Sequence, residues 1–309
     1  MKRMPQPIPY QGSKRRIANR ILALMPDEIE TLIEPFAGSA AVSVRAAYLN
    51  RASRFYLNDL NKPLMDLLSL IINEPDWIAS RYENLWQKQL GREREFYDEV
   101  RSEFNQTGRP DLFLYLLARC VKASVRYNAS GEFNQAPDNR RKGRHPKSMR
   151  AEIRAVSKLL KDKTQITSRD FTTVIESLNP VSDVIYMDPP YQGTSGGRDS
   201  RYSNGINRTD LIDFILTLNA QNAMFILSYD GRKGVKMYGR SLPDNLSLSH
   251  LEIEVGRSTQ STLLGKKDIT YESLYLSSAL VERLAATPSI IEALIRGKPL
   301  QKQLQLNFA

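Results

Sequence analysis

The order of short apolar runs and helical periods is the feature that most constrains the fold of this chain. Residues 31–36 and 55–59 read as short buried strands, and helical spacings follow them, to about residue 49 and from about 63 to 73. A strand–helix–strand–helix order favours a parallel sheet covered by helices. Strand patterns return at residues 165–170, 184–188, 224–230, 248–255 and 271–277. We therefore predict an α/β fold built on one large sheet.

Residues 74–163 differ from the rest of the chain because no strand pattern appears in them. Aromatic residues such as Trp77, Trp86 and Phe96 stand among charged residues at helical spacings. The stretch 128–147 is rich in Gly, Asn, Pro and Arg, and a basic helical pattern follows from about 149 to 161. We predict a helical insert at 74–163 that carries an exposed basic loop. The flanking segments 1–73 and 164–280 would form the main domain, with a C-terminal tail at 281–309.

Composition indicates a protein that meets a polyanion in a reducing compartment. The net charge is +10 over 309 residues, which favours nucleic acid as a partner over a merely basic surface. The single cysteine, Cys120, excludes an internal disulfide, and His145 and His250 do not stand at metal-ligand spacings. No signal peptide or membrane-length apolar run is present. We expect a cytoplasmic, nucleoid-associated protein without a metal or a membrane partner.

Asp188-Pro189-Pro190-Tyr191 follows an apolar run and precedes a glycine-rich stretch, so it lies where a strand meets its loop. Ligands bind at this carboxyl edge in open α/β sheets. The Asp188 carboxylate can accept hydrogen bonds from an amino group, and the Tyr191 ring can stack on a base. The prolines have a fixed φ and no N–H, so their carbonyls are free to point at a ligand. The alternative is an ordinary proline turn with a packed tyrosine.

A second candidate site is the turn at residues 34–40, which contains Gly38 and leads into a helix. Gly38 lets the backbone approach a ligand, and the helix start offers free N–H groups. Asp59 ends the next strand about 20 residues later, where nucleotide-binding α/β folds place an acid that binds ribose hydroxyls. The alternative for Asp59 is a helix-capping acid.

Together these segments resemble the Dam-type DNA adenine-N6 methyltransferases, the alpha group with the DPPY motif, which use S-adenosylmethionine. The matching segments, in the family's order, are residues 9–14, 34–40, 57–61, 126–134 and 188–191. The resemblance extends to about residue 277. It implies a Rossmann-like S-adenosylmethionine-dependent methyltransferase sheet with an inserted helical target-recognition domain.

The resemblance implies a role for each matching residue. Tyr10 and Lys14 would border the methionine part of the cofactor, and Asp59 would bind the ribose hydroxyls. The other implied cofactor residues are Phe36, Gly38 and Ser39 in the glycine loop, with Asp170 and Phe171 beside the adenine. The implied catalytic residues, which hold the target base, are Asp188, Pro189, Pro190 and Tyr191.

The insert supplies the expected contacts to duplex DNA. The reading segment contributes Arg126, Tyr127, Asn128 and Asn134. The basic loop contributes Arg140, Arg141, Lys142, Arg144 and Lys147, whose charges suit phosphates. The helix that follows carries Arg150, Arg154, Lys158 and Lys161 near one face, which we assign to phosphates over a merely solvated face.

The sequence departs from the family at four places. Ala40 stands where Gly is frequent, and Glu34 where Asp is common. Ser130 stands where a GATC-reading member has an arginine, and the Pro-Phe-Gly continuation after Asn134 is absent. Because an arginine can pair bidentately with guanine and a serine cannot, these departures argue against a GATC target.

The expected reaction is site-specific methyl transfer to N6 of an adenine that has left the DNA stack, since the base cannot be reached inside a duplex. Cytosine-5 methylation is disfavoured because Cys120 is not in a nucleophile motif. Two alternatives are an RNA adenine methyltransferase and a catalytically silent DNA-binding member of the fold.

Two protein partners are suggested by the sequence and the resemblance. Gln303, Leu304, Leu306 and Phe308 resemble the short peptide by which bacterial proteins dock on the replicative sliding clamp. The alternative is a frayed end that packs on the core. A cognate restriction endonuclease is the second candidate partner, since many modification methyltransferases belong to restriction–modification pairs.

Overall fold

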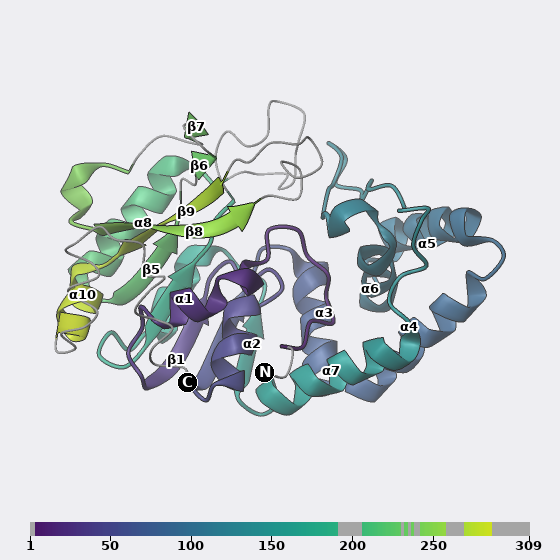
Figure 1. Cartoon of the computed structure of the whole chain (residues 1–309), viewed down its shortest axis with the longest axis horizontal. Coiled ribbons are helices and arrows are strands. Elements are labelled where there is room, and N and C mark those ends of the chain that lie inside the picture. Colours follow the sequence, from purple (N-terminus) through teal and green to yellow (C-terminus); the bar gives the residue numbers. More distant parts are fainter. Residues whose placement is uncertain are drawn as a thin grey trace.

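The computed structural model describes residues 4–190, 206–229, 232–233, 236–237, 242–257 and 269–285. Figure 1 shows a sheet flanked by helices on the left and a group of longer helices on the right. Two predicted features lie outside the described residues: Tyr191 of the catalytic motif, and the C-terminal segment with Gln303, Leu304, Leu306 and Phe308.

The first five strands of the sheet run parallel, in the order β3-β2-β1-β4-β5. They are β1 (Ile29–Glu34), β2 (Ala52–Asn58), β3 (Thr164–Thr167), β4 (Val184–Met187) and β5 (Met224–Ser228). β4 and β5 are buried along their whole length, as strands covered on both faces must be. Each of the five overlaps a predicted strand, so the α/β class is confirmed.

The far end of the sheet is antiparallel. β9 (Ile269–Leu276) pairs with β5, with β6 (Arg232–Lys233) and with β8 (Ser249–Arg257), and β7 (Lys236–Met237) pairs with β6. Among the described residues this gives a nine-stranded sheet. β8 and β9 were predicted as strands, whereas β6 and β7 are too short to show a pattern.

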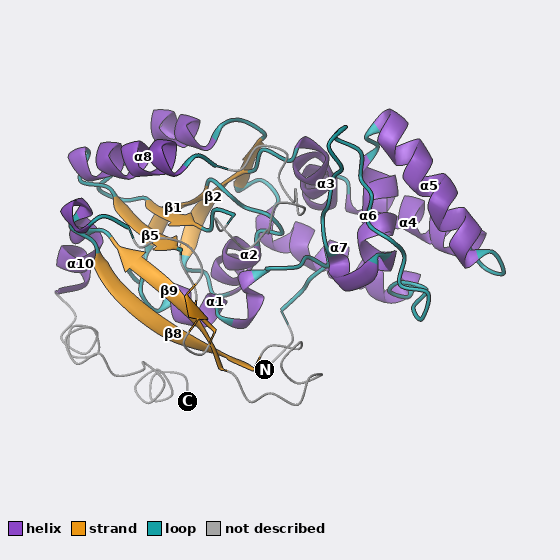
Figure 2. Ribbon diagram, turned by 90° about the horizontal axis from the view of Figure 1, so that it is seen from above, coloured by secondary structure: helices purple, strands orange, loops and turns teal. Residues whose placement is uncertain are grey.

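Helices cover both faces of the sheet, because successive strand residues point to opposite sides (Figure 2). Leu32 shares a core with side chains of α1 (Ala18–Leu22), α2 (Ala41–Tyr48) and α10 (Ser278–Ala285) on one side, and η1 (Lys14–Arg16) precedes α1. Ile33, the next residue, packs with η3 (Phe171–Ser177) and α8 (Arg208–Ala220) on the other. The sheet and its helices thus form three layers.

The predicted helical insert is confirmed as helical. It contains α4 (Pro75–Lys88), α5 (Glu93–Thr107), α6 (Pro110–Arg119) and α7 (Pro146–Leu160), and α3 (Lys62–Asn73) packs against α6 and α7. Phe104 stacks on Phe113 with ring centroids 4.9 Å apart. The buried side chains of the insert and of one sheet face form one continuous core. The division into separate domains stays a prediction.

The basic helix begins earlier than predicted, at Pro146, because His145 caps it: its Nδ1 accepts a hydrogen bond from the Lys147 N–H at 3.3 Å. Its basic face has other partners than those predicted. Arg150 lies 2.8 Å from Glu83, and Arg154 lies 2.7 Å from Asp76. These contacts join α7 to α4, which neither the phosphate interpretation nor the solvated-face alternative anticipated.

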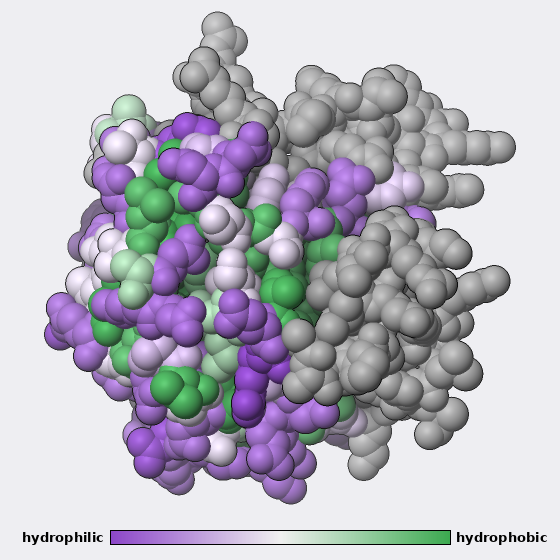
Figure 3. All heavy atoms as spheres, turned by 90° about the vertical axis from the view of Figure 1, so that its left-hand side faces the viewer, coloured by the Kyte–Doolittle hydropathy of each residue, from purple (hydrophilic) through white to green (hydrophobic). Residues whose placement is uncertain are grey.

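The outer surface of the catalytic part is mainly hydrophilic, with small hydrophobic patches between the charged groups (Figure 3). No helix in the described part of the chain is long and apolar enough to cross a membrane. The same residues contain no group of three or more His, Cys, Asp or Glu side chains that could hold a metal ion. Cys120 is buried, as expected of a core residue.

Candidate active site

The predicted site residues converge on the carboxyl edge of the parallel strands. The chain builds outward from β1 through β2 to β3, and then returns to place β4 on the other side of β1. The strand order therefore reverses between β1 and β4, and open α/β sheets bind ligands outside the carboxyl ends of the strands at such a point. The glycine turn follows β1, Asp59 follows β2, Asp170 follows β3 and Asp188 follows β4.

The glycine turn and Asp59 are tied together directly. The Gly38 N–H donates to Asp59 Oδ2 at 2.9 Å, and the Asn61 N–H donates to Oδ1 at 3.0 Å. Asp59 is only 5% exposed, and burial raises the pKa of its carboxyl. Each oxygen has a second lone pair, so the carboxylate can still accept hydrogen bonds from ligand hydroxyls.

Tyr10 covers the same turn from the N-terminal segment. Gly38 has a φ of +50°, and a Cβ at this position would lie 3.2 Å from the Tyr10 ring. Glycine is therefore required both for the backbone angle and for the close approach of the ring. Ser39, at the following position, shares a 3.2 Å hydrogen bond with Ser13, which fixes the N-terminal segment above the turn.

Ala40 caps α2 with a left-handed backbone, at φ 51° and ψ 39°. A left-handed alanine costs roughly 1–2 kcal/mol compared with the right-handed form. The fold accepts this cost because the side chain is fully buried and the N–H donates to the Ala37 carbonyl at 2.7 Å. At this departure from the family the alanine therefore holds a left-handed angle that a glycine would adopt without strain.

Glu34 is buried at the end of β1, where its Oε1 accepts a hydrogen bond from the Ser43 N–H at 2.8 Å. The pKa of this carboxyl is raised to about 7, mainly by burial and to a smaller extent by the nearby charge of Asp188, while the hydrogen bonds from Ser43 oppose the rise. The acid therefore joins the start of α2 to β1, and it changes charge near neutral pH.

Asn58, the last residue of β2, joins the loops that follow β1 and β3, a role that sequence analysis missed. Its Nδ2 donates to the Pro35 carbonyl at 3.1 Å and to the Arg169 carbonyl at 3.0 Å. Its Oδ1 accepts from Thr167 Oγ1 at 2.7 Å and from the Arg169 N–H at 2.9 Å. The sequence shows only that an amide follows the apolar run Phe55-Tyr56-Leu57.

Asp170 and Phe171 lie at the far side of the same edge. Phe171 packs against Phe36, with ring centroids 5.2 Å apart, and edge-on against Phe214 at 5.1 Å. Asp170 is exposed and caps η3, where its Oδ1 accepts from the Thr172 N–H at 3.0 Å. The rings of Phe36 and Phe171 form an apolar wall beside the exposed carboxylate of Asp170.

Asp188 stands directly after β4, and its carboxylate is held by an ion pair. Lys14 Nζ lies 2.7 Å from Asp188 Oδ1 and 2.9 Å from Glu272 Oε1 on β9. The predicted neighbour of the cofactor, Lys14, is thus in direct contact with the catalytic motif. Pro189 is buried and Pro190 half-buried, so the described part of the motif is rigidly packed.

The reading segment forms a small hairpin over the catalytic part. Tyr127 pairs with Phe133 across it, and the Tyr127 hydroxyl lies 3.4 Å from Asn61 Oδ1. Burial raises the pKa of Tyr127 to about 12. Asn128 Oδ1 accepts from the backbone N–H groups of Ser130 and Glu132, which closes the turn. Tyr127 and Asn128 therefore have structural partners.

The other two reading residues differ in exposure. Arg126 is half-buried at the base of the hairpin, and its carbonyl accepts from the Asn134 N–H at 3.1 Å. Asn134 itself is exposed. Ser130 and Glu132, at the tip of the same hairpin, are exposed as well.

Most cations of the basic loop form ion pairs with nearby carboxylates. Arg140 and Arg141 both contact the buried Asp138 carboxylate, at 3.2 and 2.9 Å, while their own side chains are mostly exposed. Lys142 lies 2.8 Å from Glu93, and Arg144 lies 2.9 Å from Glu152. Lys147 is exposed at the start of α7.

Neutral side chains of the insert hold the backbone of this loop from below, which sequence analysis also missed. The Tyr82 hydroxyl donates to the Arg144 carbonyl at 2.6 Å, and Gln89 Nε2 donates to the Lys142 carbonyl at 2.9 Å. Gly143, with a φ of +82°, sits so close that a Cβ would lie 3.0 Å from the Tyr82 hydroxyl. The path of the loop is therefore fixed.

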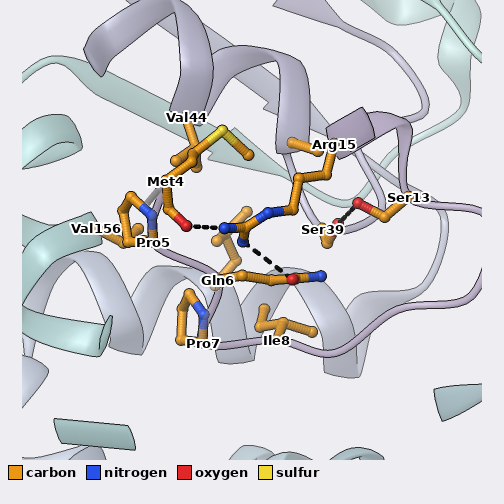
Figure 4. Close-up of a pocket in the computed structure, with 12 residues that line it drawn as sticks. Met4, Pro5, Gln6, Pro7, Ile8, Ser13, Arg15, Ser39, Val44 and Val156 are labelled. Carbon is orange, nitrogen blue, oxygen red and sulfur yellow. Dashed lines mark hydrogen bonds between the residues drawn. The ribbon is translucent and has the colours of Figure 1, made fainter. Parts of the chain in front are cut away.

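A hollow lies beside Ser39, between the N-terminal segment, α2 and α7 (Figure 4). Arg15 closes it by hydrogen bonds to the Met4 carbonyl and to Gln6 Oε1, the latter at 3.0 Å. Apolar side chains, with Val44 and Val156 among them, line much of the rest. The hollow is thus a packing gap under the N-terminal segment that reaches the glycine turn at Ser39.

Several known proteins are similar to this chain in sequence. The Type II methyltransferase M.FokI of Planomicrobium okeanokoites is 23% identical over 84% of this chain and 41% of its own length. This chain thus spans about two fifths of M.FokI. The Type II methyltransferase M.CviBI of Paramecium bursaria Chlorella virus NC1A is 26% identical over 80% of this chain and 98% of its own.

Among solved structures, the rRNA methyltransferase AviRa of Streptomyces viridochromogenes matches with a TM-score of 0.39 and 14% identity over 89% of both chains, a likeness too distant to carry an argument. The family match is of another kind, since it covers residues 10–238 and so contains every candidate site described above. The chain belongs to the D12 class of N6 adenine-specific DNA methyltransferases.

Proposed function

We propose that this chain transfers a methyl group from S-adenosylmethionine to N6 of an adenine flipped out of duplex DNA, within a specific sequence. The observation that carries the proposal is the position of Asp188. Its carboxylate is fixed by Lys14 at 2.7 Å, on the same sheet edge as the acceptor Asp59 and the turn at Gly38. A base and a cofactor could therefore meet between them.

The edge has the donor and acceptor groups that S-adenosylmethionine needs. Asp59 would accept the ribose hydroxyls, and the wall formed by Phe36 and Phe171 would take the adenine ring, with the exposed Asp170 near its amino group. Tyr10, Lys14, Gly38 and Ser39 would surround the methionine part. When bound, this cofactor supplies a methyl group on a positively charged sulfur.

Asp188 and Pro189 would act on the target base. The N6 lone pair of adenine is delocalised into the ring, so it is a poor nucleophile. Accepting both N6 protons, on the Asp188 carboxylate and the Pro189 carbonyl, would favour a tetrahedral nitrogen with its lone pair directed at the methyl group. Tyr191 follows in sequence and would stack on the base. Positioning of this kind can supply up to ~7–11 kcal/mol.

The insert would hold the DNA. The exposed side chains of Arg140, Arg141, Lys142 and Lys147 lie on a loop whose backbone is fixed, where they can meet phosphates. Lys142 can exchange Glu93 for a phosphate at low cost because that ion pair is exposed. Arg126 and Asn134 are the proposed contacts to base edges, and Arg144 to the backbone. Flipping the base would cost a few kcal/mol, which these contacts must offset.

Partners and location follow from this proposal. M.FokI and M.CviBI are named type II methyltransferases, which supports a cognate restriction endonuclease as a partner. We also propose a cytoplasmic location beside the nucleoid. Docking on a sliding clamp through Gln303, Leu304, Leu306 and Phe308 stays a prediction from the sequence.

The test is transfer of a tritiated methyl group from S-adenosylmethionine to duplex DNA, with RNA of the same sequence as a second substrate. Replacing Asp188 by Ala should lower transfer at least ~10²–10³-fold, the usual cost of losing one preorganised partner. Binding of S-adenosylhomocysteine by calorimetry should change little. Asp210→Ala, an exposed acid on α8, is the matched control. Label in RNA alone, or full transfer by the Asp188 variant, would overturn the proposal.

A further inference from the structure

Lys14 is held by two carboxylates that come from opposite ends of the sequence and from different parts of the sheet. Its Nζ lies 2.7 Å from Asp188 Oδ1, after the parallel strand β4, and 2.9 Å from Glu272 Oε1, on the antiparallel strand β9. The three side chains are largely buried, with exposed fractions of 11%, 21% and 12% for Lys14, Asp188 and Glu272.

We propose that Glu272 is a positioning residue for methyl transfer, which acts on Asp188 through Lys14. The inference rests on the proposed function, because it assigns to Glu272 the task of holding the group that meets the target amine. Glu272 does not need to touch the base or the cofactor.

The sheet register explains why Glu272 can reach Lys14. Ser228, the last residue of β5, pairs with Leu274 of β9, and Glu272 lies two residues away and thus on the same face as Leu274. Leu274 packs in the core that includes α1, the helix that follows Lys14. Ser228 Oγ also donates to Glu272 Oε1 at 2.5 Å. The carboxylate is therefore oriented by β5 before it meets the ammonium.

Two anchors do what a single ion pair cannot. A lysine side chain is a point charge on a flexible four-carbon stem, so one carboxylate leaves its head group free to swing. Contacts to both Asp188 and Glu272 fix the ammonium between β4 and β9. Because the ammonium in turn holds Asp188 Oδ1, the direction in which Asp188 faces a base depends on Glu272.

The second carboxylate also sets the charge of the cluster. As the bond from N6 to the methyl carbon forms and the carbon–sulfur bond breaks, the positive charge moves from sulfur to N6, which then loses a proton to the Asp188 carboxylate. A lysine with one carboxylate is neutral overall, so the ammonium offsets part of the stabilisation that the Asp188 carboxylate gives this charge. With Glu272 added, the three side chains carry a net charge of −1, which favours the developing cation.

Glu272→Gln tests the inference, because glutamine keeps the size and can still accept from Ser228 but carries no charge. We expect the single-turnover rate of methyl transfer to fall about 10- to 100-fold, the scale of a misplaced catalytic group. Affinities for S-adenosylhomocysteine and for DNA should stay within about threefold of the parent, since neither ligand is held by Glu272. Glu272→Ala should be no better than Glu272→Gln.

Two further variants separate this role from a structural one. Ser228→Ala leaves the charge but removes the orienting hydrogen bond, so its rate should fall between those of the parent and Glu272→Gln. Glu252→Gln is the matched control: Glu252 pairs with Ser273 and so lies on the opposite sheet face, where its loss should not change the rate.

The outcomes keep the inference apart from the proposed function. If the parent protein transfers no methyl group to DNA, the proposed function fails. If the parent is active and Glu272→Gln matches it in rate, the inference fails and the proposed function stands. The inference also fails if Gln restores the rate that Ala loses, since shape alone would then suffice, or if only substrate affinity changes.

Discussion

The sheet edge and the basic loop are held in place by opposite kinds of hydrogen bond. At the edge, backbone N–H groups hold buried acids: Gly38 and Asn61 donate to Asp59, and Ser43 donates to Glu34. In the insert, buried neutral side chains hold backbone carbonyls: Tyr82 and Gln89 donate to residues of the loop. One region fixes functional side chains, and the other fixes a chain path from which charged side chains extend.

The difference matches what each region would bind. A reacting amine and a small cofactor need atoms held to a fraction of an ångström, which is worth the cost of burying acids whose pKa values rise. Phosphates along DNA bind positively charged side chains without exact placement of each atom. Exposed cations on a backbone of fixed path are therefore sufficient. Three substitutions can break or sharpen this contrast.

The largest effect is expected from Glu34→Gln, measured as the free energy of unfolding in urea at pH 5 and at pH 8.5. Burial raises the pKa of Glu34 from 4.5 to about 7. A raised carboxyl pKa means that the parent is at full stability below about pH 4.5 and loses stability as the pH rises through 7. The rise corresponds to about 3 kcal/mol, at ~1.4 kcal/mol for each pH unit.

Glutamine can accept from the Ser43 N–H but cannot ionise, so it escapes this loss. The variant should therefore gain on the parent by about 2.5 kcal/mol between pH 5 and pH 8.5, because the parent has already lost part of this stability at pH 5. If the free energies of unfolding of parent and variant differ by the same amount at both pH values, Glu34 does not ionise within the folded protein in this range.

The next effect is expected from the double variant Lys142→Ala/Lys147→Ala, measured as DNA affinity over a range of salt concentrations. Each phosphate contact contributes about 0.9 to the slope of log K against log salt. The magnitude of the slope should fall by about 1.8 for the two lysines. Near 0.15 M salt the DNA affinity should fall about 30-fold, which is about 2 kcal/mol of binding free energy. Cofactor affinity should not change.

Arg54→Ala/Lys163→Ala removes the same charge at the opposite, amino edge of the sheet, where β2 and β3 begin, and serves as the control. An equal loss of slope in the control would show that overall charge, and not the loop, attracts DNA.

The smallest effect is expected from Tyr82→Phe, which leaves the Arg144 carbonyl without its donor at 2.6 Å. The free energy of unfolding in urea should fall by about 1–1.5 kcal/mol. Burial raises the pKa of Tyr82, so the phenol is neutral throughout and the loss should be the same at pH 5 and pH 8.5. Tyr48→Phe on α2 is the control. A pH-dependent loss would show that the loop, like the edge, is held by charge.

The sequence predicted those parts of the molecule in which local pattern and chemistry coincide. The apolar runs of β4 and β5 and the helix–strand alternation before residue 74 identify a parallel sheet, and the motifs at Gly38, Asp59 and Asp188 fall on one edge because parallel strands end there. Their roles in binding and catalysis stay predictions, since nothing in the geometry alone tests them.

Features that depend on distant pairing could not be predicted. Glu272 meets Lys14 only because β9 inserts antiparallel beside β5, and no local spacing encodes that partner. The acids of α4 that meet Arg150 and Arg154 lie far from them in sequence, so a basic helix face was assigned to phosphates. Asn58 is one amide at the end of the apolar run Phe55-Tyr56-Leu57, and the partners of its four side-chain hydrogen bonds come from the loop after β1 and from the end of β3 and its loop.

The continuous core between sheet and insert limits how this protein can acquire new targets. Leu64 and Leu68 of α3 share one buried cluster with Phe133 of the hairpin and Met149 of α7, so the insert is no detachable cassette. A chimaera that exchanged it whole between relatives would meet a mismatched surface on α3. New specificity is more readily reached by substituting exposed positions such as Ser130 and Asn134, which leave that cluster intact. A change of target and the preservation of architecture are thus separable within the same hairpin.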